Sequence, residues 1–130
     1  MEKVFNQLSD FLFTLLQGEE NLILSFSGEN SQFIRFNNAT VRQTGLVDDA
    51  DLGLKFISNS RTCRGGFTVS GNFDVDTARG KAEIARMREE AQEIPEDPFL
   101  VLPENAGSSH EIKTANGLPF EDAVEALVPA

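Results

Sequence analysis

The sequence predicts an α+β domain in which an antiparallel sheet of about four or five strands carries helices on one face. Two patterns lead to this fold class. Apolar residues recur at helical spacing near the N-terminus and again over residues 76–94, whereas they alternate with polar residues in the segment between. Because a sheet with one apolar face needs a cover on that face, the two helices are expected to supply it.

The first helix is predicted to run from about Val4 to Leu16. Its apolar residues form one wide stripe, made of Val4, Phe5, Leu8, Phe11, Leu12, Leu15 and Leu16. Gly18 is well placed to end the helix. Since Lys3 is the one basic residue nearby, we interpret the stripe as a face that packs on the sheet rather than on a membrane.

The strands are predicted from β-branched and aromatic residues and from alternation with a period of two. In order they are Leu22–Phe26, Ser31–Phe36, Thr40–Thr44, Leu52–Ile57 and Arg64–Val69. Asn37-Asn38 lies between the second and the third and suits a tight hairpin turn, because asparagine tolerates a positive φ. Phe99–Leu102, a short apolar segment between two prolines, is a candidate edge strand.

The second helix is predicted over Asp76–Glu93, with Asp74 or Asp76 as its cap and Pro95 as its end. A polar loop follows, and Pro119 is predicted to begin a third helix. Its apolar stripe would consist of Phe120, Ala123, Val124 and Leu127. We therefore expect one domain over residues 1–104. Residues 105–130 are expected to form a loop and the start of a linker helix that continues in a longer protein.

The charge and the residue composition limit the classes of molecule that the protein is expected to bind. The net charge is −10, and residues 83–130 hold 11 acidic and 3 basic residues, so a nucleic-acid backbone would be repelled. No apolar run approaches the roughly 20 residues that a membrane span needs. The single cysteine, Cys63, fits a reducing compartment. We expect a cytoplasmic protein that binds neither nucleic acid nor membrane.

Catalytic and metal-binding motifs are weak. Cys63 and the sole histidine, His110, could form a nucleophile pair, but no orienting acid has a recognisable context. His110-Glu111 begins like a zinc helix, yet the second histidine of HExxH would fall on Thr114. We therefore predict no catalytic residue, no metal ligand and no cofactor in this chain.

The hairpin segment carries a resemblance to a known family. Glu29-Asn30-Ser31, Phe33, Arg35-Phe36-Asn37-Asn38 and Val41-x-Gln43 resemble the opening domain of the TldD/PmbA family, once labelled modulators of DNA gyrase and regarded as metallopeptidases. Asp51–Phe56, Arg64–Ser70, Asp76–Ile94 and Pro95–Phe99 are similar to the pieces that follow in that domain. The resemblance covers roughly residues 21–104.

The resemblance implies a non-catalytic N-terminal domain that shapes substrate access or subunit pairing. Zinc would be held by an HExxx motif in a larger C-terminal domain, and the full-length protein would form a homo- or heterodimer and act on a peptide or protein. The expected contact residues lie on the hairpin that matches best. They are Arg35, Asn38, Arg42 and Gln43, whose side chains can pair with carboxylates or with a peptide backbone.

Two other functions stay open from the sequence. The chain could be a stand-alone cytoplasmic module that binds a peptide or a protein, because the cations of the strand region could meet an acidic segment or an extended peptide by edge pairing. These cations are Arg35, Arg42, Lys55, Arg61 and Arg64. A small hydrolase that uses Cys63 is the third reading. A reading frame that continues past Ala130 into HExxx would favour the peptidase domain.

Overall fold

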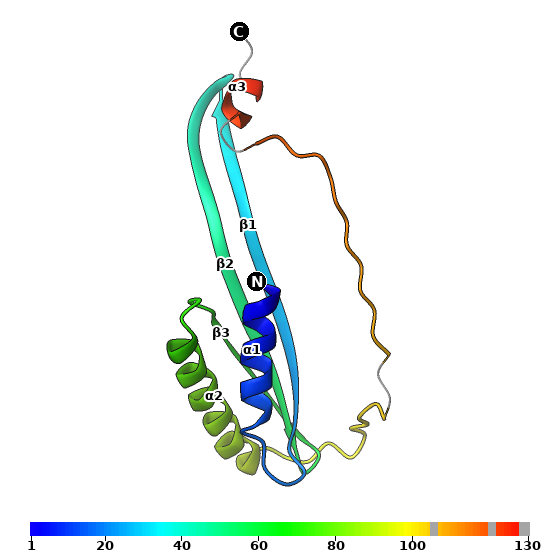
Figure 1. The fold of residues 1–130 in the computed structure, drawn as a ribbon. Coiled ribbons are helices and arrows are strands. Elements are labelled where there is room, and N and C mark those ends of the chain that lie inside the picture. Colours follow the sequence, from blue (N-terminus) through cyan, green and yellow to red (C-terminus); the bar gives the residue numbers. More distant parts are fainter. Residues whose placement is uncertain (105–106, 120–121, 128–130) are drawn as a thin grey trace. The chain divides into compact units, whose positions relative to one another are not determined.

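The computed structural model describes residues 1–104, 107–119 and 122–127. It has an α+β fold with the element order α1, β1, β2, β3, α2, α3 (Figure 1). The chain divides into two compact units. Unit 1 comprises Met1–Glu29 and Asp48–Leu100, and unit 2 comprises Asn30–Val47 and Val101–Ala130.

Within the described residues the sheet has three antiparallel strands in the order β1-β2-β3, fewer than the expected four or five. The strands are β1 (Asn21–Asn37), β2 (Thr40–Ser58) and β3 (Arg61–Thr68). Each of the first two replaces two shorter predicted strands. The predicted edge strand Phe99–Leu102 is also wrong, because these residues lie outside any strand.

Gly28 and Gly45 lie inside the long strands, in the segments between the shorter strands that were predicted. A Cβ on Gly28 would lie 2.5 Å from the Met1 sulfur, and one on Gly45 would lie 2.6 Å from the Phe33 ring. Both glycines therefore sit in extended backbone where a neighbouring side chain packs directly on the strand. In this chain they mark close contacts within strands rather than turns.

Both hairpin turns are two residues long. Asn38 and Ala39 join β1 to β2 with φ of 49° and 59°, and Asn59 and Ser60 join β2 to β3 with φ of 48° and 58°. Positive φ at both central positions is the geometry that matches the twist of antiparallel strands. The first turn was predicted one residue too early, because Asn37 is the last residue of β1.

We expect valine at both Asn38 and Ala39 to open the end of the hairpin. Each β-branched residue held at positive φ costs about 1–2 kcal/mol, so amide hydrogen exchange at Phe36 and Val41 should become about tenfold faster or more. Asn37→Val is the matched control, because position 37 is extended and accepts a β-branched side chain. If amide exchange became faster in the Asn37→Val control and stayed unchanged in the double variant, the turn would lie at Asn37-Asn38 instead.

Helix α1 spans Glu2–Phe13, ending earlier than the predicted Leu16. The Thr14 backbone N–H and hydroxyl both donate to the Phe11 carbonyl oxygen, at 3.0 and 2.6 Å, which tightens and ends the last turn. Gly18 has a φ of +53° and lies in the connection to β1 rather than at the helix end. Leu8 and Leu12 are completely buried.

Helix α2 spans Phe73–Glu93 and is capped by Asn72, not by Asp74 or Asp76 as predicted. The Asn72 Oδ1 accepts from the backbone N–H groups of Asp74 and Val75. Asp76 is instead fully buried. Its carboxylate accepts from the Ser70 N–H, the Ser70 hydroxyl and the Gly71 N–H, so it holds the loop between β3 and α2. The helix ends before Pro95, as expected.

The core of unit 1 lies between the sheet and the two helices, α1 and α2, which cover one face (Figure 1). Leu52, Leu54 and Phe56 alternate along β2 and are 0–3% exposed. They pack in one cluster with Leu12 of α1 and with Ile84, Met87 and Ala91 of α2. The predicted inner face of this strand is therefore confirmed.

Unit 2 contains the end of the β1–β2 hairpin and helix α3, Ala123–Leu127. The helix begins later than the predicted Pro119, whose carbonyl oxygen accepts from the Asp122 N–H. No residue of α3 is buried, and Leu127 is 53% exposed. Phe120, which was expected in the apolar stripe, lies outside the described residues.

Candidate functional site

The end of the β1–β2 hairpin carries the four residues predicted to make contacts. Arg35 Nη1 donates to Gln43 Oε1 at 3.3 Å across the two strands, and the Arg35 guanidinium lies 5.3 Å from the centre of the Phe33 ring. These two contacts hold the Arg35 side chain extended over the hairpin. Its remaining N–H groups can donate to a carboxylate or a carbonyl oxygen.

The structure brings together only part of the predicted set. Asn38 lies in the turn, where its carbonyl oxygen accepts from the Thr40 hydroxyl. Arg42 is exposed on β2, and no ion pair within the described part of the chain includes it. Arg35 and Gln43 therefore form a defined contact, whereas Asn38 and Arg42 are separate exposed groups of the same hairpin.

The outer edge of β1 is a second feature of the sheet. β1 is 17 residues long and lies at one end of the strand order, so no described strand pairs with its outer side. Its sequence has no proline, and its charged residues are Glu29 and Arg35. Edge strands in soluble proteins are usually short or carry prolines or lysines that prevent pairing with another chain. β1 lacks most of these protections.

The sheet face opposite the helices, called the outer face here, carries a basic hollow of about 300 Å³ in unit 1. It is lined by Ile23 and Ser25 of β1, Gly53, Leu54 and Lys55 of β2, and Arg64 and Gly65 of β3. Lys55 and Arg64 are direct partners in the β2–β3 register. Two like charges thus lie side by side on one face, an arrangement that destabilises a strand pair.

Sequence reasoning named Lys55 and Arg64 among the strand cations that could meet an acidic segment, but it did not predict that these two residues face each other. The missing signal was the turn at Asn59-Ser60. A two-residue turn there pairs Ser58 with Arg61, and counting back along both strands pairs Lys55 with Arg64. Recognising the turn would have predicted this pair.

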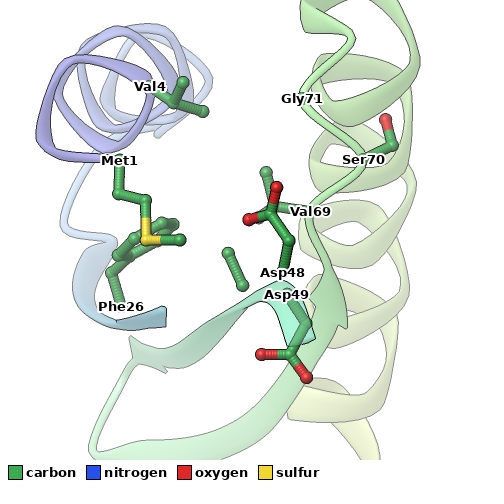
Figure 2. A pocket seen from close by; sticks show the side chains of 9 residues that line it. Met1, Val4, Phe26, Asp48, Asp49, Val69, Ser70 and Gly71 are labelled. Atoms are coloured by element: carbon green, nitrogen blue, oxygen red, sulfur yellow. The ribbon is translucent and has the colours of Figure 1, made fainter. Parts of the chain in front are cut away.

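A third candidate is a pocket of about 200 Å³ in unit 1, between the start of α1 and the strands (Figure 2). Its walls are Met1, Val4, Phe26, Asp48, Asp49, Ala50, Val69, Ser70 and Gly71. Figure 2 shows the carboxylate of Asp48 beside Val69 and that of Asp49 directed away from it. The pocket is smaller than the roughly 300–1,000 Å³ of ordinary ligand sites, so we do not assign it a ligand.

Metal-binding and nucleophilic groups do not gather into a site in the described ranges. Within them, no three His, Cys, Asp or Glu side chains form a group that could hold a metal ion. His110 and Glu111 lie in an irregular, exposed segment. Cys63 is buried on the inner face of β3, and burial raises the pKa of its thiol, which lowers the fraction of reactive thiolate.

The comparisons with known proteins identify no family. No family model, curated protein or solved structure matches this chain. Among the described helices, none combines the length and the apolar composition needed to cross a membrane. The likeness to the TldD/PmbA family therefore rests on the residues quoted above, and the function is inferred from the geometry of the hairpin and the sheet.

Proposed function

We propose that this chain is a non-catalytic cytoplasmic domain that binds an extended peptide segment along the outer edge of β1. The resemblance to the TldD/PmbA family supplies the context, in which the domain would guide a peptide or protein substrate to a zinc-dependent peptidase domain or pair with a second subunit. The single observation that carries the binding function is the long, weakly protected edge of β1.

The physical basis is strand addition. An edge strand presents a row of backbone N–H and C=O groups, and an extended peptide satisfies them by forming the next ladder of the sheet. Affinity then comes from main-chain hydrogen bonds, while side chains that alternate between the two faces provide specificity. The inner face of the sheet is covered by α1 and α2. The side chains of a bound peptide can therefore contact the sheet on the outer face, and these contacts would give the specificity.

The hairpin residues, which belong to unit 2, can contribute to the same function. Arg35 is held by Phe33 and Gln43, so little side-chain entropy would be lost when it pairs with a peptide carboxylate. Arg42 and Asn38 are exposed nearby on the same hairpin and can donate to backbone carbonyls. All four stay predicted contact residues under this proposal.

To test strand addition, synthetic peptides are varied while the protein is kept unchanged. Twelve-residue peptides in which threonine alternates with glutamate, glutamine or lysine are titrated against the protein by isothermal calorimetry. Each is also made with N-methyl groups on every odd or every even residue. N-methylation removes the donors along one edge of an extended peptide and keeps its side chains, so one methylated form of the binding peptide should lose at least tenfold in affinity.

The other methylated form is the matched control and should bind nearly as well as the parent peptide, because its methyl groups face solvent. Equal losses in both forms, or no loss in either, would contradict strand addition. In the same titrations the Arg35→Ala and Arg42→Ala double variant should weaken binding several-fold. An unchanged affinity would remove the hairpin residues from the site while leaving the edge in place.

A further inference from the structure

We propose that the peptide bound at β1 is acidic, and that Lys55 and Arg64 on the outer face bind its glutamate or aspartate carboxylates. This inference rests on the proposed function and adds the class of peptide. The two positive charges do not stabilise the sheet. Lys55 and Arg64 face each other across β2 and β3, where like charges repel and lower the stability of the strands.

Three arginines of unit 1 are paired with carboxylates. Arg61 pairs with Glu96 at 3.0 Å, Arg86 with Glu83 and Glu90 at 2.8 and 2.6 Å, and Arg88 with Glu20 at 2.6 Å. No such ion pair, within the residues that the structure describes, includes Lys55 or Arg64. Other described basic residues, such as Arg42 and Lys81, also have no ion pair, but Lys55 and Arg64 are in addition register partners. A bound carboxylate would relieve the repulsion between these two adjacent cations.

Small residues lie in and beside the hollow on the outer face. Gly53 and Gly66 are register partners. A Cβ on Gly53 would lie 2.5 Å from the Ser25 Oγ, and one on Gly66 would lie 2.7 Å from the Leu52 carbonyl oxygen. Larger residues would therefore displace Ser25 or the backbone. Gly53 lines the hollow and carries no side chain, and the hollow extends from Ile23 and Ser25 of β1 to Lys55 and Arg64.

The distances between strands fit a carboxylate that reaches across β1. Neighbouring strands are about 4.8 Å apart, so a peptide strand added outside β1 lies about 10 Å from β2. A glutamate and a lysine side chain extended toward each other span such a gap. The glutamate would pass over Ser25 and beside Ile23, which is 47% exposed and offers apolar contact to its methylene groups.

The net negative charge of the chain does not oppose this assignment. Charges more than about 8 Å away are largely screened at physiological ionic strength. Lys55 and Arg64 line the hollow together, and none of its described lining residues is acidic. The acidic remainder of the surface lowers the rate of encounter more than the stability of the bound state.

The experiment compares the glutamate and glutamine peptides described above. For the unchanged protein, the glutamate peptide should bind about fivefold to tenfold more tightly than its glutamine analogue, and the lysine peptide more weakly than both. In a Lys55→Gln and Arg64→Gln double variant this preference should disappear. Removing two like charges relieves repulsion, so the variant is expected to fold, which its circular dichroism spectrum and melting temperature verify.

A Lys3→Gln and Lys81→Gln double variant is the matched control. It changes the net charge by the same amount on the helices and should keep the preference for glutamate. Equal affinity for the two peptides in the unchanged protein, or a preference that survives in the Lys55 and Arg64 variant, would overturn the inference while the N-methyl result still supports strand addition. If none of the peptides binds, both proposals fail. Displacement of the peptide by inorganic phosphate at matched ionic strength would show a general anion site and also overturn the inference.

Discussion

Replacing Phe56 with alanine is expected to lower the free energy of unfolding by about 3–5 kcal/mol. Phe56 is 0% exposed and belongs to the cluster formed by β2, α1 and α2. Its removal leaves a cavity that the surrounding side chains can fill only in part. Since single domains of this size are stable by about 5–15 kcal/mol, the variant should unfold at a much lower urea concentration, measured by circular dichroism.

Phe13→Ala is the matched control for Phe56. Phe13 is 48% exposed and ends α1, so the same truncation there buries no cavity and should cost less than about 1 kcal/mol. The two variants must be compared at equal slope of the denaturation curve, because a change in slope would mean a change in the unfolded or native state. Similar losses from both would show that Phe56 does not lie at the centre of the core.

The second large effect is expected from the ion pair between Arg88 and Glu20. Arg88 Nε and Nη2 donate to the Glu20 carboxylate at 2.6 and 2.8 Å, and Nη2 also donates to the Leu15 carbonyl oxygen at 3.0 Å. The Glu20 side chain is 8% exposed. Arg88→Met keeps the apolar stem but leaves a shielded carboxylate without its donors, which should cost about 2–3 kcal/mol at neutral pH.

The same pair predicts a dependence on pH. The hydrogen bond from Arg88 holds the pKa of Glu20 below its usual value of 4.5. A lowered pKa in the folded state means that the stabilisation is complete above the pKa of the unfolded chain and is lost as the pH falls through the folded value. Stability should therefore decline below about pH 4.5, and this contribution should be absent in Arg88→Met.

Glu90→Gln is the control for the ion pair. Glu90 also contacts an arginine, Arg86, at 2.6 Å, but the two side chains are 44% and 50% exposed. Solvent screens such pairs, so this variant should change stability by less than about 1 kcal/mol. Urea denaturation at pH 7 and at pH 3.5 measures all three proteins. A loss in Arg88→Met no larger than that in Glu90→Gln would show that the Glu20 carboxylate is well solvated.

Local patterns predicted much of the fold. The alternation of Leu52, Leu54 and Phe56 predicted the buried face of β2, and Pro95 predicted the end of α2, because both depend on side chains and backbone within a few residues. Local reasoning was wrong about the lengths of the first two strands and about the residue that caps α2. The short strands predicted on either side of Gly28 and Gly45 are continuous in β1 and β2, and each glycine lies beneath a side chain from another part of the chain. Asn72 rather than Asp76 caps α2 because Asp76 binds the preceding loop.

By itself, the sequence determined the α+β class, the two covering helices and the hairpin at Asn38-Ala39 to within one residue. These features follow from periodic patterns and turn residues, which reflect interactions between residues close together in the sequence. Only the tertiary structure decided which distant groups meet. It set Lys55 beside Arg64 through the β2–β3 register, joined Glu20 to Arg88 from residues 68 apart in the chain, and left one side of β1 without a described strand. These outcomes depend on strand pairing and helix packing, which bring together residues that no local pattern connects.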